Sequence, residues 1–191
     1  MKIACLLGSP RRHGNSSTVA EHFCNTAVGF GAEVRTFALN ELKYRGCQAC
    51  MACKTKLDRC ILDDDLSEVL GAVSESDIVV LASPVYFGEV SSQMKAFIDR
   101  TFSFLVPDYI TNPKKSRLEP GKTLIFVLAQ GNPDEKAFSN IFPKYDFFFK
   151  LSGFESRLVH ACGVREAGEV KGRKELLDLA EKTAKQVFNK M

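Results

Sequence analysis

The chain has 191 residues, of which 45% are hydrophobic and 26% charged, and its formal net charge is +3 at pH 7. This composition is typical of one globular domain and excludes global disorder, and so mild a charge does not indicate nucleic-acid binding. The apolar runs are far shorter than the ~20 residues of a membrane-spanning helix, so we expect no membrane contact. The N-terminal apolar run stops at Gly8, too early for a signal peptide, and we expect a cytoplasmic protein.

Short apolar runs alternate with amphipathic stretches along the chain, which predicts an α/β fold with a doubly wound, mostly parallel sheet and helices on both faces. The expected strands are Lys2–Leu7, Glu33–Ala38, Asp77–Ala82, Lys122–Ala129 and Ser156–Ala161. The expected helices are Thr18–Phe30, Asp65–Ser74, Val90–Phe102, Pro133–Leu151 with a break or kink at Pro143, and Gly172–Lys190.

Residues 1–191 are interpreted as a single domain with two segments that a minimal α/β unit does not need. One is a cysteine-rich insertion at about 46–60, and the other is a long loop at about 104–121 that contains Pro107, Pro113 and Pro120. Loops of this length are often functional or lie at interfaces.

The segment Gly8–Thr18 follows the first strand and opens the first helix. Ligands of parallel sheets bind beyond the carboxyl ends of the strands, and a helix N-terminus attracts phosphate groups. The segment adds hydroxyl, amide and guanidinium donors, so it predicts a site for a terminal phosphate. A turn with an N-capping serine is the simpler alternative. Neither GxGxxG nor GxxxxGK[ST] occurs here, which disfavours a dinucleotide-binding Rossmann fold and a P-loop NTPase.

Two further loops are expected at the same edge of the sheet. Ser83–Gly88 follows the third strand and carries an aromatic pair beside a glycine, and Gln130–Pro133 follows the fourth strand. An aromatic pair at a strand end could hold a flat ring, although Tyr86 and Phe87 could instead cap the core. The convergence of three such loops favours a ligand site.

LLGSPRRHGNSST and SPVYFGEVSSQMKAFIDR resemble motifs of the NAD(P)H-dependent FMN reductase branch of the flavodoxin-like fold. The resemblance extends over nearly the whole chain and is weakest at 104–120. It implies a five-stranded parallel sheet in the order 2-1-3-4-5, and an enzyme that passes electrons from NAD(P)H through FMN to a small acceptor such as a quinone or free flavin. It also implies a homodimer or homotetramer. Because the flavin carries the chemistry, no catalytic side chain is expected.

The resemblance assigns FMN contacts to residues of all three loops. The phosphate would be held by Ser9, Arg11, Asn15, Ser16 and Ser17, the ring by Pro84, Val85, Tyr86, Phe87 and Gly88, and further ring or ribityl contacts by Gln130 and Gly131. Asp99 and Arg100, in the second motif, are interpreted as a structural ion pair or interface groups rather than catalysts.

Four of the seven cysteines are grouped, with the spacing Cys47-x2-Cys50-x2-Cys53-x6-Cys60. Four thiolates suit a [4Fe–4S] cluster or a zinc ion, and the compact first three favour the cluster. The arrangement also resembles the cysteine motif of iron–sulfur flavoproteins, which implies an alternative function: electron transfer between ferredoxin-like donors and an acceptor. Free or redox-active thiols are a further alternative, and with them a thiol or zinc sensor.

Overall fold

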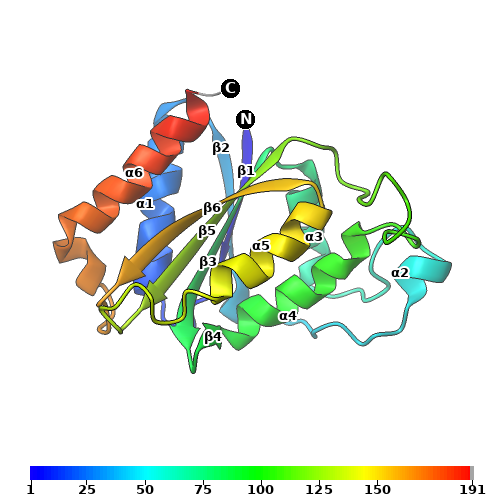
Figure 1. Cartoon of the computed structure of the whole chain (residues 1–191), viewed down its shortest axis with the longest axis horizontal. Coiled ribbons are helices and arrows are strands. Elements are labelled where there is room, and N and C mark those ends of the chain that lie inside the picture. Colours follow the sequence, from blue (N-terminus) through cyan, green and yellow to red (C-terminus); the bar gives the residue numbers. More distant parts are fainter. Residues whose placement is uncertain (190–191) are drawn as a thin grey trace.

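A parallel sheet of five long strands forms the centre of the computed structural model, which describes residues 1–189 (Figure 1). The strands lie in the order β2-β1-β3-β5-β6, which is the expected order 2-1-3-4-5 of the long strands. Their bounds are β1 (Lys2–Leu7), β2 (Glu33–Ala38), β3 (Ile78–Tyr86), β5 (Lys122–Gln130) and β6 (Phe154–Cys162). The predicted flavodoxin-like fold class is therefore confirmed.

The expected number of strands was wrong, because the sheet also contains the short strand β4 (Glu89–Val90). β4 pairs antiparallel with the end of β3, which continues beyond the predicted boundary at Ala82 through Pro84 to Tyr86. Phe87 and Gly88 form the turn, and both have positive φ angles (51° and 78°), as a two-residue hairpin requires. A strand of two residues, such as β4, is too short to show an alternating pattern in the sequence. Pro84 argues against a strand, so the sequence does not indicate that β3 continues past Ala82.

Five helices cover the two faces of the sheet (Figure 1). One core packs the sheet against α1 and α6, and the other packs it against α3, α4 and α5. Neighbouring strand residues such as Val79 and Val80 face opposite cores, which explains why the strands are apolar throughout. The bounds are α1 (Asn15–Gly29), α3 (Leu66–Glu75), α4 (Ser92–Arg100), α5 (Ile141–Leu151) and α6 (Lys174–Phe188).

The predicted helix at Pro133–Leu151 is shorter than expected, because turns occupy residues 133–140 and α5 begins at Ile141. Pro143 therefore lies in the first helical turn, where its missing N–H needs no partner, and it does not kink the helix. The predicted final helix reaches Lys190, which lies outside the described residues. Of the helices within residues 1–189, none has the length and apolar character needed to cross a membrane.

Short helical turns lie in the connections. They are η1 (Leu39–Glu41), α2 (Ala52–Thr55), η2 (Thr101–Phe104) and η3 (Glu169–Gly172). α2 lies within the predicted cysteine-rich insertion, and η2 opens the predicted long loop.

The hydroxyl of Ser91 joins the first loop, which is the predicted phosphate-binding segment that begins at Gly8, to the start of α4. It donates a hydrogen bond to the carbonyl of Gly8 (2.6 Å) and accepts one from the Met94 amide (3.3 Å), so that it caps the helix. The Ser91 amide in turn donates to the hydroxyl of Ser83 at 2.9 Å. A Cβ atom on Gly8 would lie 2.9 Å from Met94 Cβ, so only glycine allows this close approach. β1, β3 and α4 are thus fixed together where β1 ends.

We predict that Ser91→Ala lowers the free energy of unfolding by about 1–2 kcal/mol, because the α4 cap is lost and the buried Gly8 carbonyl loses a donor. Denaturant unfolding measures the change. Ser92, the exposed next residue, provides a matched control. Ser92→Ala should change the free energy of unfolding by less than about 0.5 kcal/mol. Equal effects of the two substitutions would contradict the role given to Ser91.

Candidate functional site

The first loop places three buried serines at the N-terminus of α1. Ser9, Ser16 and Ser17 are all buried, and the Ser16 Oγ atom has no hydrogen-bond partner among the described residues. A buried hydroxyl without a partner is uncommon and calls for an explanation such as a ligand. A Cβ atom on Gly14 would lie 2.3 Å from Ser9 Oγ, so a glycine keeps the loop tight. These features fit a phosphate group, which offers acceptor oxygens to helix amides and hydroxyls.

Two predicted phosphate ligands of the first loop instead contact the segment that follows β6. Asn15 Nδ2 donates to the Glu166 carbonyl (2.8 Å), and Asn15 Oδ1 accepts from the Val170 amide (3.1 Å). Arg11 Nη1 donates to the Arg165 carbonyl at 2.7 Å. The Asn15 side chain therefore holds this segment against α1, so the contact predicted between Asn15 and phosphate remains a prediction.

Arg165, which sequence analysis did not select, connects the first loop to the third. Its Nε atom donates to the Gly131 carbonyl at 3.2 Å, while its own carbonyl accepts from Arg11. A Cβ atom on Gly131 would lie 2.7 Å from Arg165 Cγ, which explains the glycine. The contact joins residues that are 34 positions apart, and no motif in the sequence signals it.

The third loop is organised by Gln130, whose side chain is buried at the end of β5. Its Nε2 atom donates to the carbonyls of Asn132 (3.0 Å) and Asp134 (2.9 Å). Its Oε1 atom lies 2.9 Å from Nε2 of His160, a half-buried residue whose pKa is lowered by burial. Since this side chain is already engaged, Gln130 supports the loop around Gly131, and its predicted contact with FMN remains a prediction.

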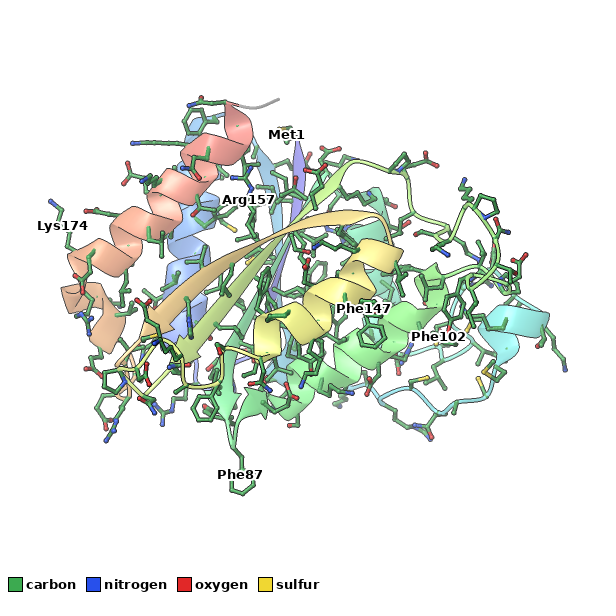
Figure 2. All side chains as sticks on the ribbon, in the orientation of Figure 1. Met1, Phe87, Phe102, Phe147, Arg157 and Lys174 are labelled. Carbon is green, nitrogen blue, oxygen red and sulfur yellow. The ribbon has the colours of Figure 1, made fainter. Side chains whose placement is uncertain are left out.

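The second loop is the β3–β4 hairpin. Pro84 and Val85 are half-buried, whereas Tyr86 is exposed and Phe87 is fully exposed at the tip. Figure 2 shows that Phe87 points away from the sheet, so the structure does not bring its ring together with the other two loops. Gly88 lies in the hairpin turn.

Glu89, directly after the hairpin turn, connects the second loop to α5. Its carboxylate accepts hydrogen bonds from its neighbour's amide (Val90 N, 2.9 Å) and from the Tyr145 hydroxyl (2.9 Å), and it pairs with Lys144. Burial alone would raise the pKa of Glu89, but the bonds from Lys144, Val90 and Tyr145 lower it. Burial and the bond to Glu89 raise the pKa of Tyr145. The hairpin is therefore anchored by a charged carboxylate.

Together the three loops lie at the carboxyl ends of β1, β3 and β5, which are the three adjacent strands at the centre of the sheet (Figure 1). The first offers buried hydroxyls and helix amides, and the other two offer backbone and an aromatic side chain. This arrangement is suited to a ligand with a phosphate at one end and a flat ring at the other.

The four grouped cysteines line a single cavity of about 610 Å³, whose other walls come from α4, η2 and α5. Cys47 and Cys50 are exposed, and Cys53 and Cys60 are partly buried. Four thiols suit an iron–sulfur cluster or zinc. Within residues 1–189, no three potential ligands are already grouped to hold a metal ion. The donor set thus fits a metal centre, and the four thiols share one cavity without converging on one point among the described residues.

Two cations support the middle of the cysteine-bearing segment, which is the predicted insertion at residues 46–60. Lys54 Nζ donates to the carbonyls of Phe102 (2.6 Å) and Leu105 (2.5 Å) and lies 4.1 Å from the centroid of the Phe102 ring. Arg117, from the long loop, donates to the carbonyls of Cys53 (2.8 Å) and Leu105 (2.6 Å). Burial, with a smaller contribution from the charge of Arg117, lowers the pKa of Lys54. The long loop therefore helps to fix Cys53.

Asp99 and Arg100 each form an ion pair, as one of the two sequence interpretations expects, but with other residues rather than with each other. Asp99 accepts from Lys95 one turn earlier on α4 (2.5 Å), and Arg100 pairs with Asp64 at 2.9 Å. Residues 99 and 100 differ by about 100° around a helix, so neighbouring side chains point in different directions.

Residues 1–136 match the NADPH-dependent FMN reductase family. An iron–sulfur flavoprotein from Archaeoglobus fulgidus is 32% identical over 90% of this chain and 68% of its own length. An iron–sulfur flavoprotein from Methanosarcina thermophila is 34% identical over 53% of this chain, and this chain spans about half (52%) of that protein.

Solved structures share the fold at low sequence identity. A NAD(P)H:quinone oxidoreductase from Methanothermobacter marburgensis has a TM-score of 0.74 and 14% identity, with 98% of this chain and 96% of that chain covered. An FMN-dependent NADH-azoreductase from Bacillus anthracis has a TM-score of 0.71 and 14% identity, with 98% and 100% covered.

Proposed function

Because the chain belongs to the NADPH-dependent FMN reductase family, we propose that its three loops bind FMN and that the flavin passes electrons from NAD(P)H to a small acceptor. Membership of this family makes the chain a flavin oxidoreductase with FMN as cofactor and NAD(P)H as reductant. Family membership does not specify which residues hold FMN, which acceptor is reduced or where the protein is located. For the location we propose the cytoplasm.

The observation that carries the proposed site is the buried hydroxyl of Ser16 at the N-terminus of α1, which has no hydrogen-bond partner within residues 1–189. A phosphate oxygen at this position would accept from Ser16 and from free amides of the first helical turn. The positive end of the helix dipole would add to the attraction. Arg11, which is exposed and in the same loop, would contribute charge while its contact with the Arg165 carbonyl holds it in place.

The ring of the flavin would lie between the second and third loops. Pro84, Val85 and Tyr86 form the end of β3, and Gly131 follows β5, the strand paired with β3. Backbone amides in these loops would donate to the ring, and the anchored Glu89 and Gln130 would keep the two loops at a fixed spacing. FMN, when bound, supplies the hydride and electron chemistry, so the chain's residues need only bind, orient and tune it.

A small, flat acceptor such as a quinone or free flavin suits this site, because Tyr86 is exposed beside it and could stack on a ring. Phe87, Phe147 and Phe148 are exposed as well, which supports the proposal of a homodimer or homotetramer. Phe87 would then contact a ring only if a second copy of the chain lay against the hairpin.

Replacing the Ser16 hydroxyl tests the phosphate site directly. Ser16→Ala should weaken FMN binding about tenfold, since it removes one charge-assisted hydrogen bond. A titration that follows FMN fluorescence measures the dissociation constant. Thr26→Ala is the matched control, because Thr26 lies near the other end of α1 and its hydroxyl donates to the His22 carbonyl within the same helix (3.0 Å). Wild-type affinity in Ser16→Ala would remove Ser16 from the site.

The grouped cysteines favour a second candidate function, electron transfer between a ferredoxin-like donor and an acceptor through an iron–sulfur cluster. Cys47, Cys50, Cys53 and Cys60 would hold a [4Fe–4S] cluster, because all four thiols line one cavity. The relatives described above as iron–sulfur flavoproteins support this candidate. A thiol or zinc sensor would use the same four side chains, but it would not need the three loops.

Anaerobic reduction of the FMN-loaded chain separates these functions, with iron, acid-labile sulfide and zinc measured on the same sample. Rapid loss of the oxidised flavin spectrum with NADPH is the result that the reductase predicts. Reduction by ferredoxin but not by NADPH, together with about four irons per chain, would favour the electron carrier and overturn the first candidate. One zinc per chain without flavin binding would favour the sensor.

A further inference from the structure

Arg100, at the C-terminus of α4, is the largest side chain that the fold buries completely, with 1% of its surface exposed. Burying a guanidinium is costly unless it is paired and hydrogen-bonded. Its partners are therefore informative, and each of them lies in or beside the cysteine-bearing segment rather than in the sheet.

The guanidinium bonds to both ends of the segment. Nη1 donates to the carbonyl of Arg45 (3.0 Å), two residues before Cys47, and Nη2 donates to the carbonyl of Leu62 (3.2 Å), two residues after Cys60. Asp64 Oδ2 accepts from Nη1 (2.9 Å) and also from the amide of Arg45 (3.2 Å). Arg100 and Asp64 thus close the chain from 45 to 64 into a loop.

Cys60 is the cysteine that this contact affects most directly. Cys60 and Arg100 line the same cavity as the other three thiols, and Cys60 lies two residues before the Leu62 carbonyl that Arg100 holds. The Nε atom of Arg100 is buried and has no hydrogen-bond partner among the described residues.

The first three cysteines have a different support. Arg117 fixes the Cys53 carbonyl, and Lys54, the next residue, is bonded to η2. Six residues separate Cys53 from Cys60, and Cys60 itself is within two residues of the Leu62 carbonyl that Arg100 holds. Two separate anchors therefore set the spacing between Cys60 and the other thiols.

We propose that Arg100 is the positioning residue of the cysteine-bearing segment: its guanidinium joins the two ends of the segment and keeps Cys60 at the wall of the cavity that Cys47, Cys50 and Cys53 also line. The proposal extends the second candidate function, in which these thiols hold a cluster. A lysine keeps the charge of Arg100 but cannot bond two carbonyls and a carboxylate at once in a fixed plane. The planar geometry of the Arg100 guanidinium, and not only its charge, should therefore determine the position of Cys60.

The first test is alkylation of the full metal-free chain with iodoacetamide, read at each cysteine by mass spectrometry. Arg100→Lys should raise the labelling rate of Cys60 roughly tenfold, as the loss of a charge-assisted hydrogen bond implies, and should raise that of Cys53 much less. FMN bound per chain should remain at the wild-type value. Arg35→Lys is the control, since Arg35 forms an exposed pair with Glu68 at 2.7 Å.

The second test is uptake of iron and sulfide by the same chains under anaerobic conditions. Arg100→Lys should lower cluster affinity about tenfold or more, as the loss of supporting contacts does at other metal sites, while Arg35→Lys leaves it unchanged. If Arg100→Lys does not fold, Asp64→Asn carries the test, because it weakens the same contacts and should change both measurements in the same direction.

The two measurements separate failure of this proposal from failure of the cluster. A wild-type chain that takes up no iron would overturn the cluster, and the labelling of Cys60 would still decide the role of Arg100. Unchanged Cys60 labelling in Arg100→Lys, or equal acceleration at Cys53 and Cys60, would overturn the positioning role.

Discussion

The close approach of the Gly8 backbone to β3 and α4 is the constraint on which the candidate flavin site depends. Gly8 N donates to the Ala82 carbonyl (2.8 Å), and the Gly8 carbonyl accepts from the Ser91 hydroxyl. These bonds fix the positions of the first loop, the hairpin and the start of α4 relative to one another. The loops can therefore be short and still face one ligand, because a rigid contact at their base positions them.

The same helix connects that site to the cysteine-bearing segment. α4 begins at the Ser91 cap beside the candidate flavin site and ends at Arg100, which bonds to both ends of the segment. Figure 1 shows α2 beyond the C-terminal end of α4, away from the carboxyl ends of the strands. None of the three loops lines the cavity that the four thiols line. Within one chain, the candidate flavin site and the thiols are therefore separate regions held by opposite ends of one helix.

The sequence predicts the parts of the fold that depend on local pattern. Apolar runs predict the five long strands, and the loop after β1 is recognised by its serines and glycines. Contacts between distant residues cannot be recognised in this way: Arg100 pairs with Asp64 rather than Asp99, and Arg165 reaches Gly131. The amides of Asn15 and Gln130 are predicted ligand groups, and the fold adds contacts with loop backbone atoms that the sequence does not reveal.

Hydrogen–deuterium exchange of the full chain, with and without FMN, tests the central claim most directly, namely that the three loops form one flavin site. If they do, FMN addition should slow exchange in residues 8–18, 84–90 and 130–134, with little change in residues 46–61. Protection confined to residues 46–61, or an absence of FMN-dependent protection in the three loops, would contradict it.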